Sequence, residues 1–268
     1  MNPFLSTYKT SFETIPFSKI NNEHYLPALK KGIELTQAEI QNIISNPQPP
    51  TFQNTIEVME KTGDIINKVT AAFFNLNAAN TNDEMQSLAQ EISPLLTAHG
   101  NDIMMNKELF DRIKVEYESG FEGLTTEQET LLTKTYKSFV RNGANLSENE
   151  KNRLREIDTL TAKLSLTFGE HVLKESNQFK LVLDNQKDLS GLPQSVIEAA
   201  SITAKNEGYE NKWVFTLDYP SYIPFMTYAE NRSLREQMYR AFNSKGFQDN
   251  DNNNTAVVRK ITKLRAER

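Results

Sequence analysis

Apolar residues recur at three- and four-residue steps along most of the chain, which is the spacing of one face of an α-helix. After the proline-rich breaker at 46–50, this stripe predicts one long helix over 52–76; its apolar members are Ile56, Met59, Ile66, Val69, Phe73 and Leu76. Three more helices are predicted to start at capping boxes, where two side chains three positions apart satisfy free backbone N–H groups of the first turn. The boxes are Thr81 with Glu84, Thr125 with Gln128, and Ser147 with Glu150.

Helix interiors and ends are marked as well. Pro94 lies inside the helix that starts at 81 and predicts a kink, because proline removes a backbone hydrogen bond. The helix from 125 has Arg141 in its last turn and Gly143 as its stop. From 147 a stripe runs for about eight turns, with His171 beside it; its members are Leu154, Ile157, Leu160, Leu164, Phe168 and Val172.

The pattern changes after residue 178. Segments 179–184 and 212–218 are short and rich in β-branched and aromatic residues, which predicts two strands of a small ladder. The region 193–208 between them is helical in pattern, and the prolines of 219–226 predict an extended segment. The predicted fold class is therefore mostly α, with one small two-stranded β element.

Two helices, near 231–244 and 255–268, are predicted to close the chain, separated by an asparagine-rich loop at 247–254 that we expect to be too polar to pack. The last helix has no glycine, proline or polar tail to end it, so we expect a truncated chain. Its apolar stripe is expected to fold back on the 231–244 helix as an antiparallel pair; the stripe is Val258, Ile261 and Leu264. The expected organisation is a helical bundle at 1–146, a long helix with the β-ladder at 147–229, and the start of a further domain at 230–268.

Composition narrows the classes of function. The formal net charge of -5 disfavours nucleic acid and anionic membrane surfaces as partners. The chain has neither a run of about 20 apolar residues nor a basic and apolar signal peptide at its start, so we expect a cytosolic protein. Without cysteine, a metal site would need the three histidines and carboxylates.

The histidines are the first candidates for chemistry. His171 and Glu175 share one helical face, but a zinc-peptidase helix needs two histidines at this spacing and a glutamate between them, so we expect a histidine at the edge of a buried stripe. His24 is expected to bond locally at a helix start. His99 precedes a glycine and is expected to cap a helix end, where a cation is favoured. No residue of the chain is assigned as catalytic or metal-binding, and the substrate-binding residues are unknown.

The aromatic run at 219–228 leaves two interpretations open. Rigid rings on a proline-stiffened segment suit peptide or ligand contacts, and they also suit a tertiary junction. The sequence contains no glycine-rich phosphate loop, nucleophile elbow or paired-carboxylate motif. From the residues alone, the chain is an α-rich body without a catalytic constellation.

Three long blocks, at 73–103, 136–147 and 211–242, resemble the thimet oligopeptidase family of zinc metallopeptidases, and within it the bacterial peptidyl-dipeptidases and oligopeptidases A. The resemblance covers nearly the whole chain. It implies a mostly helical, two-lobed enzyme whose channel admits short unfolded peptides, with zinc on a His-Glu-x-x-His helix. That helix has no counterpart here, so the chain resembles the amino-terminal portion of such an enzyme.

The resemblance also implies partners and activity. Residues 230–268 would be the first helices of the catalytic domain, and the chain's partners would be short unfolded peptides and the rest of its own catalytic lobe. Zinc would be the cofactor of the full-length enzyme, and this portion alone would bind none and be inactive. The alternative is a freestanding α-helical module that binds a peptide or protein without catalysis.

Overall fold

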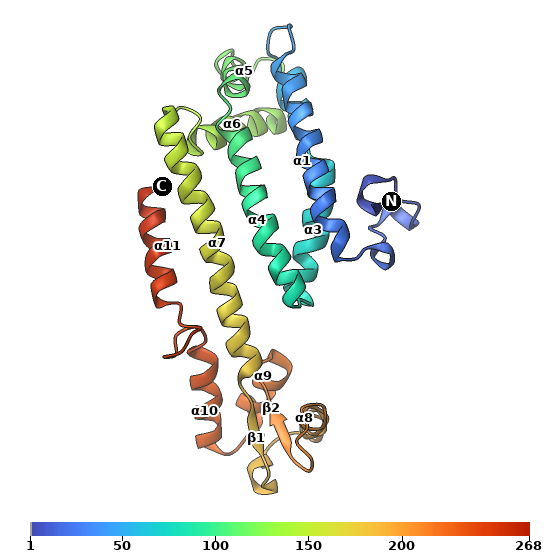
Figure 1. Ribbon diagram of the computed structural model, residues 1–268, viewed down its shortest axis with the longest axis vertical. Coiled ribbons are helices and arrows are strands. Elements are labelled where there is room, and N and C mark those ends of the chain that lie inside the picture. The colour runs from blue at the N-terminus through green and yellow to red at the C-terminus, as the bar shows by residue number, and fades with distance from the viewer. Residues whose placement is uncertain (1) are drawn as a thin grey trace. The chain divides into compact units, whose positions relative to one another are not determined.

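The computed structural model describes residues 2–268, which group into two compact units: 2–163 together with Arg268, and 164–267. Both units are mainly helical, and the second contains a two-stranded sheet (Figure 1). The predicted fold class is therefore confirmed. The predicted division into 1–146, 147–229 and 230–268 stays a prediction.

The first unit is a helical bundle preceded by three short 3₁₀ turns. Its elements are η1 (Pro3–Leu5), η2 (Ser11–Glu13), η3 (Phe17–Lys19), α1 (Asn22–Ile44), η4 (Phe52–Glu57), α2 (Val58–Glu60), α3 (Asp64–Ala79), α4 (Asp83–Met104), α5 (Lys107–Glu118), α6 (Thr126–Arg141) and the first half of α7 (Glu148–Gln178). Helix α1 packs against α3, where the Tyr25 and Phe73 rings meet edge to face with centroids 5.1 Å apart. Helices α5 and α6 close a second part of this core around Phe110 and Phe139.

The single helix predicted over 52–76 is wrong. A π-helical turn and the short α2 end before Gly63, which adopts a left-handed backbone with φ of 79°, and α3 starts at Asp64. Glycine takes this conformation without the steric cost of a Cβ atom, so the chain changes direction there. The apolar period crosses the break because residues on both sides are buried: Ile56 and Val69 are both 0% exposed.

The predicted helix starts are mostly right. The box at 125 is confirmed, with Thr125 N–H donating to Gln128 and Gln128 N–H donating back to the Thr125 hydroxyl. Helix α4 starts one residue later than predicted: Asn82 caps it by accepting from the Met85 N–H at 2.9 Å. Asparagine competes well with threonine at this position because its side-chain oxygen reaches the same N–H groups. Helix α4 continues through Pro94, and the kink there stays a prediction.

The second unit holds the end of α7, a small sheet and four further helices. Its elements are β1 (Leu181–Leu183), η5 (Gln186–Leu189), α8 (Gln194–Asn206), β2 (Trp213–Phe215), α9 (Tyr219–Tyr228), α10 (Arg232–Asn243) and α11 (Thr255–Glu267). The predicted pairing of the two strands is confirmed over fewer residues, and it is antiparallel, with Val182 opposite Val214. Phe215 and Phe225 are fully buried and touch with ring centroids 4.6 Å apart at the centre of this unit's core.

The extended segment predicted at 219–226 is wrong, because these residues form α9. Pro220 lies in the first turn, where its missing N–H would have no partner inside the helix. The Tyr222 N–H donates to the Asp218 carbonyl at 2.7 Å and closes that first turn. Pro224 costs one further backbone bond, which the burial of Tyr222 and Phe225 offsets.

The antiparallel helix pair predicted at the carboxy end is also wrong. Helices α10 and α11 lie end to end, with the loop at 245–254 between them (Figure 1). The predicted stripe on α11 is only partly covered, since Leu264 is 6% exposed and Val258 is 46% exposed. The stripe predicted on α7 behaves similarly: Leu154 and Ile157 are buried, whereas Phe168 is 41% exposed.

Candidate functional site

The histidine and glutamate that suggested half of a zinc site both hold the loop after α10. Glu175 is 5% exposed, and its carboxylate accepts from the Gly246 N–H at 2.6 Å and from the Asn250 amide at 2.7 Å. His171 Nδ1 lies 2.9 Å from Asn254 Oδ1. We name this set of five residues the α7–loop clamp: His171, Glu175, Gly246, Asn250 and Asn254.

The clamp also fixes which ring nitrogen of His171 carries hydrogen. Asn254 is 2% exposed and donates its side-chain amide to the Phe168 carbonyl at 3.2 Å. Its side-chain oxygen therefore faces His171 as an acceptor, so Nδ1 is the donor. The prediction that the loop at 247–254 is too polar to pack holds for 247–251, which are exposed, and is wrong for Asn254, because a buried polar group packs well when its hydrogen bonds are satisfied.

Gly246 is the residue that allows this close packing. Its φ is 72°, and a Cβ atom placed on it would lie 2.6 Å from Asn254 Nδ2 and 3.2 Å from a Val172 methyl group. The Asn254 N–H also donates to the Gly246 carbonyl at 2.7 Å. The loop therefore needs glycine at this position for both its backbone conformation and its space.

The clamp residues do not fit a zinc site of the His-Glu-x-x-His type. Across residues 2–268, no three histidine or carboxylate side chains gather closely enough to hold a metal ion. His171 uses Nδ1 on Asn254, and both oxygens of Glu175 accept hydrogen bonds within the chain. That the chain itself binds no metal stays a prediction.

The other two histidines have local surroundings. His24 lies in the first turn of α1, where its Nδ1 accepts from the Asn21 N–H at 3.1 Å, so it helps to cap that helix. The capping role predicted for His99 is wrong, because α4 continues past it to Met104. His99 is 7% exposed, and its Nδ1 has no hydrogen-bond partner within residues 2–268. Burial lowers the pKa of His99, and the nearby Asp102 opposes this in part.

The aromatic run at 219–228 contributes some of its rings to the hydrophobic core, and its other rings are exposed to solvent. Tyr222 stacks on Phe242 of α10 with centroids 4.1 Å apart, and burial raises the pKa of the Tyr222 hydroxyl. Tyr219 and Tyr228 are 68% and 52% exposed. The tertiary junction, one of the two interpretations of this run, is therefore present. Peptide or ligand binding by the exposed rings stays a hypothesis.

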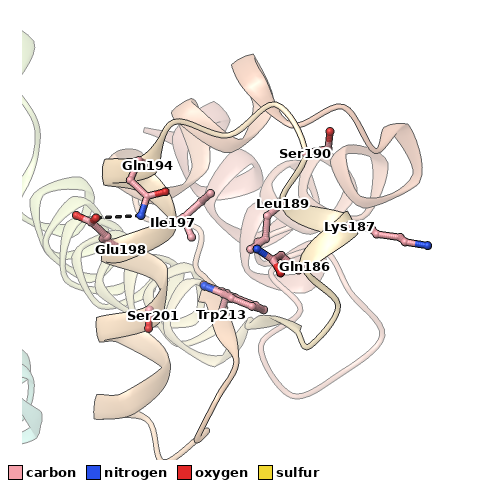
Figure 2. A pocket seen from close by; sticks show the side chains of 9 residues that line it. All are labelled: Gln186, Lys187, Leu189, Ser190, Gln194, Ile197, Glu198, Ser201 and Trp213. Carbon is pink, nitrogen blue, oxygen red and sulfur yellow. Dashed lines mark hydrogen bonds between the residues drawn. The ribbon is translucent and has the colours of Figure 1, made fainter.

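A groove of about 700 Å³ lies in the second unit between η5 and α8, beside the chain's single tryptophan (Figure 2). Trp213 and Leu189 lie on one side of it, and Ile197 of α8 lies across from them. Polar side chains on both sides complete the lining, and Gln194 donates to Glu198 at 3.0 Å. Sequence reasoning missed this site; the one available signal was the lone tryptophan in a short strand.

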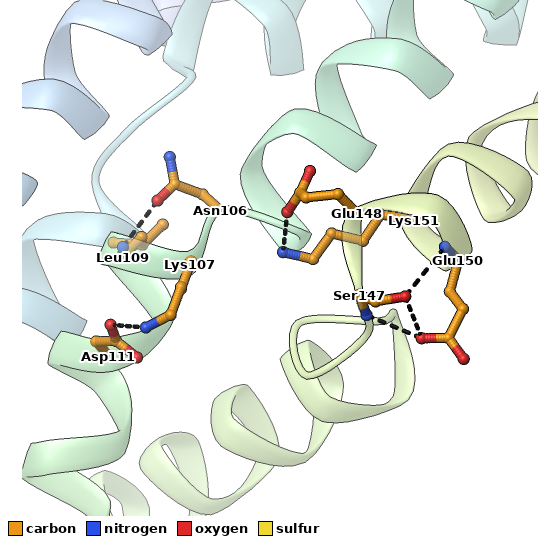
Figure 3. Close-up of polar contacts among 8 residues, drawn as sticks. All are labelled: Asn106, Lys107, Leu109, Asp111, Ser147, Glu148, Glu150 and Lys151. Carbon is orange, nitrogen blue, oxygen red and sulfur yellow. Dashed lines mark hydrogen bonds and ion pairs between the residues drawn. The ribbon is translucent and has the colours of Figure 1, made fainter.

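A polar cluster at the start of α7 has a structural explanation (Figure 3). The Ser147 hydroxyl and N–H both donate to Glu150, which confirms the predicted capping box and lowers the pKa of that carboxyl. Lys151 is 4% exposed, and its ammonium lies 3.3 Å from Glu148. Because this buried lysine is paired, the cluster explains how the helix begins and suggests no chemistry.

Comparisons with known proteins place the chain. No family model matches it. The dipeptidyl carboxypeptidase of Escherichia coli (strain K12) is 32% identical over 268 residues, which cover 100% of this chain and 39% of that protein. Oligopeptidase A of Haemophilus influenzae is 30% identical over 94% of this chain and 37% of its own length, and a thimet-like oligopeptidase of Dictyostelium discoideum is 24% identical over 91% and 36%. Over its whole length the chain is therefore homologous to the dipeptidyl carboxypeptidases and oligopeptidases A of the thimet oligopeptidase family, and it spans 39% of the length of the Escherichia coli relative.

Proposed function

We propose that this chain is the amino-terminal portion of a metallopeptidase that cleaves short peptides. The observation that carries the proposal is the match of the whole chain to relatives named dipeptidyl carboxypeptidase and oligopeptidase A, each more than twice its length. Similarity at 32% identity over all 268 residues supports a shared activity of the whole protein.

Within that protein, this chain would form part of the wall that admits unfolded peptides and excludes folded ones. The zinc ion would be held by histidines and a glutamate outside residues 1–268, where it would polarise the scissile carbonyl and activate water. Release of carboxy-terminal dipeptides is the specific reaction that we propose, after the printed name of the Escherichia coli relative.

The printed names of the relatives give two locations. One Arabidopsis thaliana relative is named a probable cytosolic oligopeptidase A, and another is named chloroplastic/mitochondrial. Throughout residues 2–268, no helix has both the length and the apolar character needed to cross a membrane. A cytoplasmic location stays a prediction.

Two measurements test the proposal. Reading the coding sequence past codon 268 should show an in-frame continuation that encodes His-Glu-x-x-His. The longer protein should then release a dipeptide from the carboxy end of an acetylated tetrapeptide, and a chelator should abolish this release until zinc is restored. A stop codon directly after 268 would favour the alternative, a freestanding helical binding module. A longer protein without hydrolysis would refute the peptidase proposal itself.

A further inference from the structure

The groove beside Trp213 has the size and shape of a binding site. Its volume of about 700 Å³ lies within the range of roughly 300–1,000 Å³ that is usual for small-ligand sites. In Figure 2 the Trp213 ring lies beside Gln186 and below Leu189, and the side chains of α8 face them from the other side. No step of the proposed peptidase reaction uses this groove.

The walls of the groove are held in place by contacts outside it. On the η5 side, Asp188 accepts from the Asn231 amide at 2.9 Å, and Leu189 is 5% exposed. Gly191, with φ of 84°, lets this segment approach the end of α9, where a Cβ atom would lie 2.2 Å from the Tyr228 carbonyl oxygen. On the other side α8 packs against β2, with Ala200 and Ala204 buried. The site is therefore preformed, which lowers the entropic cost of binding.

Three polar groups that line the groove are not used by the protein. Gln186 and Ser201 are exposed and Trp213 is half-buried, and within residues 2–268 the Gln186 amide, the indole N–H and the Ser201 hydroxyl have no hydrogen-bond partner. They provide both donors and acceptors around an apolar surface. The charged residues of the lining have both signs, Lys187 and Glu198, so the site has no strong preference for a net charge.

We propose that this groove binds a short peptide segment, with an aromatic or large apolar side chain against Trp213 and the peptide backbone held by Gln186 and Ser201. A peptide backbone carries alternating N–H and C=O groups, which match the unused amide and hydroxyl, and a ring suits the tryptophan face. A carbohydrate could use the same groups. The choice of a peptide rests on the proposed function, because the relatives are named as peptidases.

The single tryptophan makes the test direct, because tryptophan fluorescence, excited selectively over tyrosine, reports on this groove alone. The probe is an acetylated, amidated tripeptide with a central phenylalanine, and a tripeptide with a central alanine is the comparison. We expect a saturable change in emission with the phenylalanine peptide and binding at least about fivefold weaker with the alanine peptide. Gln186→Ala and Ser201→Ala should each weaken binding about three- to tenfold, as expected for one lost hydrogen bond.

Matched controls separate this site from the rest of the surface. Gln237→Ala removes an exposed glutamine from α10, and Ser195→Ala removes an exposed serine of α8 outside the groove; both should bind like the unchanged chain. Circular dichroism of every variant checks folding. Three results would overturn the proposal. They are an absence of saturable binding, an affinity of the Gln186→Ala and Ser201→Ala variants equal to that of the unchanged chain, and a fluorescence response to maltotriose in place of the peptides. Peptide binding without peptidase activity in the longer protein would refute only the proposed function, and activity without this binding would refute only the groove.

Discussion

Removing the carboxylate of Glu175 should destabilise the second unit more than the substitution of any exposed side chain on the same helix. Glu175→Ala removes two charge-assisted hydrogen bonds, one to the buried Gly246 N–H and one to the Asn250 amide. Such a bond contributes about 1.5–3 kcal/mol. Asn250 is exposed and can bond to water instead, whereas the Gly246 N–H is left without a partner. We therefore expect a loss of about 2–4 kcal/mol in the free energy of unfolding.

A series of three substitutions tests whether the charge-assisted hydrogen bonds of Glu175 cause this loss. Glu175→Gln keeps an oxygen for the Gly246 N–H but loses the charge, so we expect a smaller loss of about 1 kcal/mol. Lys174→Ala, on an exposed neighbouring position of α7, should change the free energy by less than about 0.5 kcal/mol. Urea unfolding followed by the emission of Trp213, which lies in the same unit, measures all three.

Hydrogen exchange gives an independent reading of the same series. Amides at 246–254 should exchange faster in Glu175→Ala than in the unchanged chain, while those of α8 should change little, because the clamp acts on the loop first. If Glu175→Ala and Lys174→Ala differ by less than about 0.5 kcal/mol, or if exchange across the loop is unchanged, the clamp contributes no measurable stability and the reasoning fails.

Three further predictions follow from single residues. Gly246→Ala should lower the free energy of unfolding by about 2–3 kcal/mol, because left-handed backbone strain costs about 1–2 kcal/mol and the new methyl group meets Asn254; Gly208→Ala has a similar φ of 78° with open space around it and should cost only the strain. His99 has a pKa below its ordinary value of 6.5, so the unfolded chain binds the proton more readily and stability should fall as pH drops below about 6.5; unfolding measured from pH 7 to pH 5 should show a shallower fall in His99→Leu. After dialysis against a weak chelator, the chain should retain well under one equivalent of zinc, and zinc retained by the chain but lost in His171→Ala would contradict the clamp as the role of that histidine.

The parts of the fold that could be predicted are those decided by neighbours in sequence. The capping boxes at 125 and 147 each involve two side chains three residues apart, so their geometry depends on local backbone alone. The apolar period that predicted the bundle is also local. The break at Gly63 and the helix at 219–228 were missed because glycine and proline each allow two backbone outcomes, and contacts distant in sequence decide between them.

The difference between contacts local in sequence and contacts distant in sequence also explains the α7–loop clamp and the groove beside Trp213. Spacing alone places His171 and Glu175 on one face of a helix, but their partners Asn254 and Gly246 are 83 and 71 residues further along the chain. A pair of polar side chains at helical spacing is compatible with a metal, a substrate or a docked loop, and only the partner selects among them. In the groove, Trp213 and Gln186 are adjacent because an antiparallel pairing sets Trp213 opposite Leu183 and η5 follows β1 directly. A lone tryptophan near a strand is weak evidence of a site until that pairing brings polar groups without partners to its side.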